Sequence, residues 1–118
     1  MKKTRVVHIN AIEQTVDEKF ISSLEDVQAL VGGLIERVGI IGNGDELYAD
    51  EEGQLKDHDF FFAFPMVING ETQKVFIAGN GYIIGQVDDE GDNTDAKSTV
   101  KEIREAVSIK KRIREEKT

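Results

Sequence analysis

The sequence predicts a single α+β domain. We expect a mostly antiparallel sheet packed by one short helix, at about residues 23–32, and one longer C-terminal helix, at about residues 95–116. Runs of β-branched and aromatic residues recur between glycine-containing turns, which is typical of antiparallel strands, while two other segments repeat apolar residues at helical spacing. The length of 118 residues fits one domain and is enough to bury a core without a disulfide or metal.

The N-terminal third is expected to hold two strands and the short helix. Residues 5–9 and 15–21 are rich in β-branched residues and predict strands. Ser22 and Glu25 have the spacing of a capping box at a helix start. Gly32 follows the helix and favours the left-handed conformation of a helix end. The apolar positions of the helix form one stripe: Leu24, Val27, Leu30 and Val31.

The middle of the chain predicts further strands. Residues 34–41 and 46–49 are expected as strands on either side of a turn. Residues 60–68 contain four of the six phenylalanines and the only proline, Pro65, which favours a sheet edge or a bend. Asn69-Gly70 tolerates the positive φ angles of a two-residue hairpin, so residues 74–78 should return antiparallel to residues 64–68.

The last third predicts one more strand and the longer helix. Gly79-Asn80-Gly81 is expected to form a hairpin turn before a strand at residues 82–87. Val100, Ile103 and Val107 begin a loose apolar stripe on the helix, and basic residues 110–114 fall near its C-terminal end, where the helix dipole favours cations. We expect the core to come from residues 34–41, 60–68, 75–78 and 82–87.

Charge divides the chain into an acidic body and a basic C-terminal segment that belong to the same fold. Residues 1–93 carry 7 Lys and Arg against 18 Asp and Glu, a net −11, and residues 94–118 carry 8 against 5, a net +3. An acidic body repels phosphates, so nucleic acid is not the expected partner. It either attracts a protein with a basic surface or only keeps the domain soluble. The basic cluster at residues 110–114 leaves contact with phosphate as a minor alternative.

Several classes of site are excluded by composition or pattern. The chain contains no cysteine, which removes disulfides, thiolate metal sites and cysteine nucleophiles. No apolar run approaches a signal peptide core or the ~20 residues of a membrane span, so we expect a cytoplasmic protein. The acidic loop at residues 88–95 lacks the ligand spacing of an EF-hand. We therefore expect no cofactor, no metal and no catalytic residue.

Two turns supply the candidate binding residues. The polar turn at residues 50–52 belongs to the acidic surface that would engage a partner protein. A small ligand or nucleotide would instead use glycine turns, such as residues 42–44 and 79–81, at an oligomer interface. The second of these glycine turns leads into a strand rather than a helix, which argues against a phosphate loop. The candidate residues are Asp50, Glu51, Glu52, Gly79, Asn80, Gly81 and Tyr82.

Three segments together carry a resemblance to a known family. They are LEDVQALVGGLIE at residues 24–36, LYADEEGQLK at residues 47–56 and FIAGNGYIIG at residues 76–85. In this order they resemble a family of small domains of unknown function that occurs in bacteriophages, plasmids and their bacterial hosts. The resemblance covers about residues 5–87; Phe60–Phe64 and the basic C-terminal segment depart from it. It implies a phage-related or mobile-element origin and assigns no catalytic residue.

Three functions are compatible with these observations. The leading hypothesis is a non-enzymatic accessory module that binds, and thereby inhibits, a host or phage protein through its acidic surface, with a homodimer through the C-terminal helix as a further possibility. The alternative is a protein that binds or sequesters a small molecule or nucleotide. The third is a hydrolase in which Asp57 or Asp59 orients His58 as a general base, although no nucleophile lies beside them in the sequence.

Overall fold

The computed structural model describes residues 3–53 and 59–111, which form an α+β fold dominated by strands. Both helices are short. In chain order the elements are β1 (Thr4–Asn10), β2 (Thr15–Ile21), α1 (Leu24–Val31), β3 (Ile35–Ile40), β4 (Glu46–Asp50), β5 (Phe60–Ile68), β6 (Glu71–Ala78), β7 (Gly81–Ile84), α2 (Val100–Ala106) and β8 (Ser108–Lys111).

The strands form two antiparallel sheets rather than the single sheet that we predicted. One sheet has the order β2-β1-β7-β4-β3 and the other has the order β6-β5-β8. The predicted hairpin at Gly79-Asn80-Gly81 is wrong, because this segment leads from β6 in the smaller sheet to β7 in the larger one. β7 instead lies in the centre of the larger sheet, between β1 and β4. All four of its residues are buried there, whereas a strand at a sheet edge beside β6 would have a neighbouring strand on one side only.

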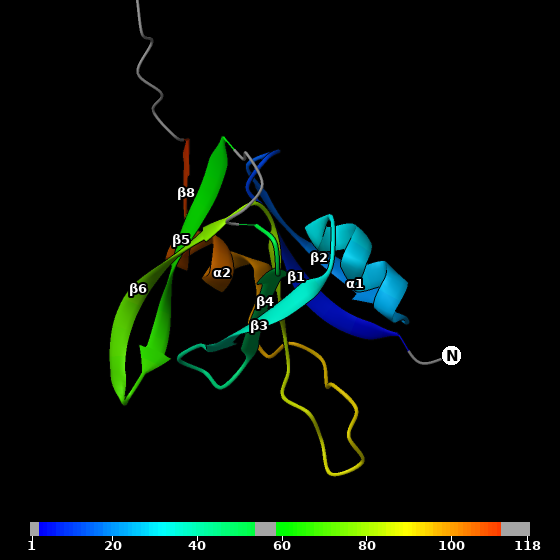
Figure 1. The fold of residues 1–118 in the computed structure, drawn as a ribbon. Coiled ribbons are helices and arrows are strands. Elements are labelled where there is room, and N and C mark those ends of the chain that lie inside the picture. Colours follow the sequence, from blue (N-terminus) through cyan, green and yellow to red (C-terminus); the bar gives the residue numbers. More distant parts are fainter. Residues whose placement is uncertain (1–2, 54–58, 112–118) are drawn as a thin grey trace, which may run out of the picture.

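The fold has three layers, in which the five-stranded sheet lies between α1 and the three-stranded sheet (Figure 1). Its buried residues form two apolar clusters. The larger cluster fills the space between the sheets, where Val7, Ile9 and Leu47 meet Phe62 and Phe64. The smaller cluster lies on the opposite face of the five-stranded sheet, beneath α1. α2 lies beside the larger cluster and contributes the buried side chain of Ile103 to it.

The predicted core was correct for three segments and wrong for one. β5, β6 and β7 all place side chains in the interior. Residues 34–41 contribute little except Ile41, since β3 is an edge strand whose residues are exposed or half-buried. The core prediction omitted β1, although Val6, Val7 and Ile9 are completely buried. Strands on both sides of β1 and packing on both of its faces account for this burial.

The first helix is confirmed, and its cap lies one residue beyond the predicted one. Ser23 is the N-cap, and its hydroxyl accepts a hydrogen bond from the Asp26 amide at 3.2 Å. Asp26 in turn accepts the Ser22 amide at 2.8 Å. These hydrogen bonds hold the pKa of Asp26 below its ordinary value, chiefly through the backbone of Ser22. Gly32 ends the helix at φ 86°, as predicted.

The second helix is much shorter than the predicted span of residues 95–116. α2 begins after a capping box at Thr99 and Glu102 and ends at Ala106. The following residues form β8, which pairs with Phe60–Ala63 of β5. The apolar stripe therefore changes from helical to alternating spacing at Val107, because the exposed edge of β5 gives the backbone hydrogen-bond partners. Residues 112–116 lie outside the described part of the chain, and a dimer through this region stays a prediction.

The Asn69-Gly70 hairpin between β5 and β6 is confirmed. Both residues have positive φ, 52° and 80°, and Ile68 pairs with Glu71 across the turn. Pro65 lies beyond Ala63, the last residue of β5 that pairs with β8, so it has a neighbouring strand on one side only. This position agrees with the predicted edge location, since proline cannot donate a backbone hydrogen bond.

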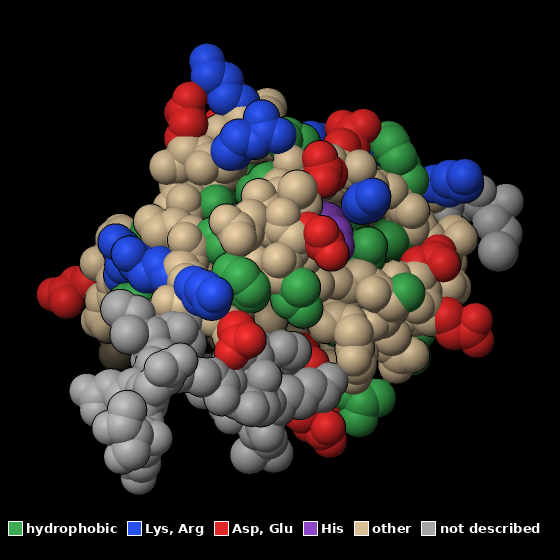
Figure 2. All heavy atoms as spheres, turned by 90° about the horizontal axis from the view of Figure 1, so that it is seen from above, with side chains coloured by type: hydrophobic (Ala, Val, Ile, Leu, Met, Phe, Trp, Pro, Cys, Tyr) green, Lys and Arg blue, Asp and Glu red, His purple; other side chains and the backbone are tan. Residues whose placement is uncertain are grey.

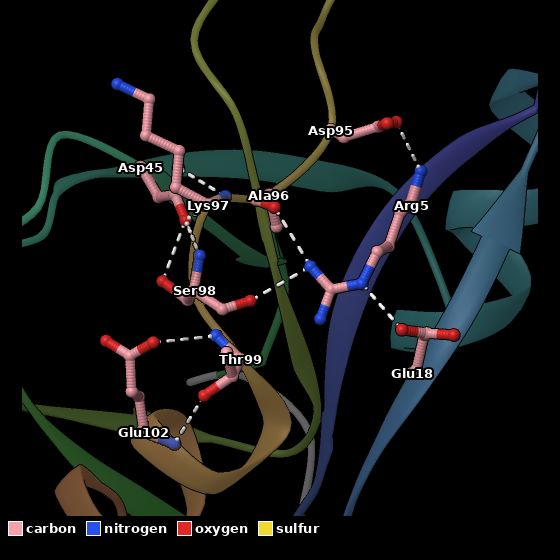
Figure 3. A network of polar contacts seen from close by, with 9 residues as sticks. All are labelled: Arg5, Glu18, Asp45, Asp95, Ala96, Lys97, Ser98, Thr99 and Glu102. Atoms are coloured by element: carbon pink, nitrogen blue, oxygen red, sulfur yellow. Dashed lines mark hydrogen bonds and ion pairs between the residues drawn. The ribbon is translucent and has the colours of Figure 1, made fainter.

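A polar network ties the segment before α2 to the five-stranded sheet and to the turn before β4 (Figure 3). The Arg5 guanidinium donates to the carbonyls of Ala96 and Ser98, both at 2.9 Å, and pairs with Glu18 at 2.6 Å. On the other side, the completely buried Asp45 carboxylate accepts the Lys97 and Ser98 amides and the Ser98 hydroxyl. These contacts determine where α2 begins.

Candidate functional site

The structure brings the two predicted binding turns together. β4 and β7 are neighbours, so Ala49 pairs with Gly81 and Tyr48 pairs with Tyr82. The turn after β4 therefore lies beside the segment that enters β7. A Cβ atom on Gly53 would come within 2.6 Å of the Ala78 carbonyl, which shows how close the two segments are.

Several of the predicted binding residues have structural roles that account for their identity. Asp50 is buried, and its carboxylate accepts the Glu52 amide at 2.9 Å. The Asn80 side chain accepts the Ala11 amide at 2.9 Å and closes the turn between β1 and β2. A Cβ atom on Gly81 would lie 2.8 Å from the Tyr48 carbonyl, so glycine is required there by packing. Glu51 and Glu52 are exposed, and Tyr82 lies in the cleft described below.

The histidine hypotheses have different outcomes. Asp57 and His58 lie outside the described residues, so the hydrolase hypothesis stays untested. His8 is buried, and its Nε2 lies 2.7 Å from the Leu30 carbonyl, as expected of a packed strand histidine. Burial lowers the pKa of His8. Within residues 3–53 and 59–111 no group of three or more acidic or histidine side chains is arranged to hold a metal ion.

Much of the negative charge has a structural use. Several carboxylates accept hydrogen bonds within the fold: Glu18, Asp26, Asp45, Glu46, Asp50, Asp88, Asp95 and Glu102. On the face shown in Figure 2, acidic side chains are interspersed with basic ones rather than gathered in one patch. A binding site for a basic partner therefore has to be sought in local geometry rather than in net charge.

One cleft of about 560 Å³ lies beside α1, on the face of the five-stranded sheet that α1 packs against. Its apolar lining comes from the sheet and the helix, and includes Ile35, Ile84 and Leu24, whose side chain is 59% exposed. Ser22 and Ser23 border it at the start of α1, and Asp92 and Asn93 border it on the acidic loop. Asp92 is the only charged residue among the described residues that line the cleft.

Two stacked tyrosines form part of the cleft. The rings of Tyr48 and Tyr82 have centroids 5.3 Å apart and planes within 7° of parallel. They stack because they are directly opposite each other on adjacent strands and on the same face of the sheet. Tyr82 is buried, whereas Tyr48 is half-buried, so Tyr48 presents the more accessible ring.

The hydroxyl of Tyr48 is fixed by a charged neighbour. It donates a hydrogen bond of 2.9 Å to the Glu46 carboxylate, which also lies 3.4 Å from the Arg37 guanidinium. Burial and this hydrogen bond raise the pKa of Tyr48, and burial raises the pKa of Tyr82 further. Both phenols are neutral near pH 7, as an unperturbed tyrosine also is, and can take part in ring contacts and hydrogen bonds.

Comparison with known proteins identifies the family. The chain matches the domain of unknown function DUF3846 over residues 2–108. The chain belongs to the DUF3846 family. No curated protein and no solved structure shows significant similarity to it. This match confirms the resemblance to a family of domains of unknown function. The family description assigns no activity to its members.

We call the cleft beside α1, which contains the stacked Tyr48 and Tyr82, the tyrosine cleft. Most of the residues that line it in this DUF3846 chain were not among the binding residues predicted from the sequence. Tyr82 was a candidate, but Tyr48, Ser23 and Asn93 were not. Tyr48 lies 34 positions before Tyr82, and nothing local indicates that the two strands are adjacent. No helix among the described residues has the length and apolar character needed to cross a membrane.

Proposed function

We propose that this DUF3846 domain is a non-enzymatic binding module that accepts a basic segment of a partner protein in the tyrosine cleft. The observation that carries the proposal is the combination of an accessible Tyr48 ring and a lining whose only described charge is the Asp92 carboxylate. A lysine or arginine side chain over the Tyr48 ring would gain about 0.5–2 kcal/mol from the cation–π interaction. Asp92 would then attract the same positive charge.

The surrounding apolar side chains would hold the aliphatic part of such a basic residue. Ile35, Ile84 and the exposed Leu24 offer apolar contact beside the tyrosine rings. Long basic side chains bury their methylene groups along apolar surface while the charged end keeps polar contacts. The hydroxyls of Ser22 and Ser23 and the amide of Asn93 are the polar groups nearest to that end.

Binding is favoured over catalysis by the composition of the cleft lining. The described lining contains no histidine, lysine or arginine that could serve as a base or hold an anionic intermediate. Inhibition of a host or phage protein by occupation of its basic surface is one action that such a module could have.

A small ligand is the alternative occupant, and the size of the cleft favours it. A volume of about 560 Å³ lies within the usual range for small-molecule sites. The charge of the lining limits the ligand to a neutral or cationic aromatic or aliphatic compound, and gives a nucleotide phosphate no cationic partner. A thermal-shift screen separates the alternatives, since a small ligand specific to the native state raises the melting temperature without any protein partner.

We also propose that the protein acts in the cytoplasm as an accessory protein of a phage or other mobile element. The sequence resemblance supports this origin, and the absence of cysteine agrees with a reducing compartment.

The test is capture of partners from bacterial lysate with three versions of the protein. We expect the wild-type protein and Phe20→Leu to retain the same basic protein, and Tyr48→Leu to lose it. Phe20 is a suitable control, because it is 55% exposed and is not among the residues that line the cleft. Capture should weaken as salt is raised, since ionic contacts are screened. If no captured protein depends on Tyr48, the proposal is wrong.

A further inference from the structure

The outer face of the three-stranded sheet carries two phenylalanines and two lysines that have no part in the tyrosine cleft. Phe61 of β5 pairs with Lys110 of β8, and Phe76 and Lys74 of β6 are two residues apart. The register places all four side chains on one face, because side chains two residues apart in a strand point the same way and paired residues share a face. We call this surface, made by Phe61, Phe76, Lys74 and Lys110, the lysine–phenylalanine face.

This face points away from the core. The intervening residues of β5, Phe62 and Phe64, are almost completely buried between the sheets. Phe76 is 55% exposed and Phe61 is half-buried, and their ring centroids lie 6.0 Å apart. The feature that sets Phe76 apart from other exposed apolar residues, such as Phe20, is its ring contact with Phe61 between two lysines on the same face.

The charge of this face differs from that of the rest of the molecule. The strands of the three-stranded sheet carry Lys74, Lys110 and Lys111 against Glu71, a net of +2, whereas those of the five-stranded sheet carry a net of −2. None of the β5, β6 and β8 positions that share the lysine–phenylalanine face is a carboxylate. An acidic protein thus has one locally basic sheet face with aromatic rings on it.

We propose that the lysine–phenylalanine face binds single-stranded nucleic acid. Bases stack on exposed aromatic rings in proteins that bind single strands, while lysines contact the phosphates. A lysine lies on each side of the ring pair: Lys110 is opposite Phe61 on β8, and Lys74 is two residues before Phe76 on β6. A nucleic acid strand that crosses the sheet diagonally would therefore meet a cation before and after the two rings. A duplex hides its bases and cannot use the rings in this way.

Neighbouring carboxylates limit the path of such a strand. Three acidic residues share a cavity with Phe76 and Ala78 toward the end of β6: Glu36, Asp50 and Glu51. A phosphate chain would be repelled there, so the favourable path leads from Lys74 across Phe76 and Phe61 to Lys110. Lys111 takes no part in this path, because it pairs with Phe60 and lies on the opposite face of the sheet, 6.0 Å from the Phe60 ring. This inference is independent of the function proposed for the cleft.

The experiment measures binding of a fluorescein-labelled oligothymidylate of about 12 nucleotides by fluorescence anisotropy. We expect Phe76→Ala to weaken binding about fivefold or more, because loss of one stacking ring has an effect of at least this size. Phe20→Ala is the matched control: Phe20 is also 55% exposed but lies on β2 of the other sheet, and its substitution should leave binding unchanged.

The salt dependence tests the lysines separately. Replacement of both Lys74 and Lys110 by glutamine should reduce the slope of log affinity against log salt by about 1.4, since each phosphate contact of a single strand contributes about 0.7. Lys19→Gln, an exposed change on β2, should leave the slope unchanged. Melting curves of each variant verify that the fold is intact.

Three results would overturn the proposal. One is no binding of the oligothymidylate by the wild-type protein at low salt. A second is equal loss of binding in Phe20→Ala and Phe76→Ala. The third is binding of polyglutamate with the same affinity and the same dependence on Phe76, which would assign the face to an acidic protein instead of a nucleic acid.

Discussion

Replacement of Asp45 by alanine should destabilise the fold more than any surface substitution. The carboxylate is completely buried, in the turn before β4. It accepts the Lys97 amide at 2.9 Å, the Ser98 amide at 2.9 Å and the Ser98 hydroxyl at 2.7 Å. Alanine would leave two backbone N–H groups without a partner in the segment that leads into α2.

The size of the effect follows from these donors. A buried donor left without a partner costs about 1–3 kcal/mol, and hydrogen bonds to a charged group are stronger than average. The Ser98 amide is buried, whereas the Lys97 amide is only partly buried and the Ser98 hydroxyl can rotate. We therefore expect Asp45→Ala to lower the free energy of unfolding by about 2–4 kcal/mol. That is a large part of the ~5–15 kcal/mol that stabilises a typical domain.

Urea unfolding followed by circular dichroism measures this change. With a slope of about 1–3 kcal/mol per molar urea, the midpoint should fall by roughly 2 M or the protein should be unfolded without urea. Asp89→Ala, in the exposed acidic loop, is the control and should change stability by less than about 0.5 kcal/mol. A loss below about 1 kcal/mol in Asp45→Ala would refute the reasoning, since the amides would then have found other partners.

Three further predictions concern other contacts. Gly81→Ala should destabilise the protein by about 1–3 kcal/mol, because its Cβ would lie 2.8 Å from the Tyr48 carbonyl; an unchanged melting temperature would contradict this. Burial lowers the pKa of His8 below 6.5, so unfolding free energy should be greatest above pH 6.5 and should fall as the pH is lowered through that value toward the pKa of the folded state. His8→Gln should flatten this dependence between pH 8 and 5 in urea titrations at each pH, and an equally steep fall in the variant would assign it to other groups. Thr99→Ala removes the N-cap of α2 and should cost about 1 kcal/mol, measured as a shift of the urea midpoint; no shift would show that the Glu102 side chain suffices.

Local signals in the sequence were sufficient for most of the elements. The helix at residues 24–31 has an apolar stripe and a glycine end, and the hairpin has Asn69-Gly70, so each is determined by residues close together. The C-terminal helix was wrong at residues 108–111, which form β8, because the apolar residues there fit a helix and a strand equally well. The edge of β5, which selects the strand, comes from residues about 50 positions earlier.

The candidate site was less predictable, for the same physical reason. Tyr48 and Tyr82 are ordinary strand residues until β7 is placed beside β4. The acidic turn and the glycine turn drew attention through their composition, but Asp50, Asn80 and Gly81 are explained by local hydrogen bonds and close packing. Exposed rings such as Phe76 cannot be distinguished from buried ones, such as Phe62, before the register of the hairpin is known.

The position of β7 has a consequence for synthesis of the chain. β1 and β4 do not pair with each other, since β7 lies between them, and β7 begins only at Gly81, so it is made after both early hairpins. Until then the inner edges of the two early hairpins remain open to pairing with other chains. Ribosome-bound fragments that stop before residue 81 should therefore be held as separate hairpins and be prone to aggregation, and folding should become cooperative only when residues 81–84 emerge.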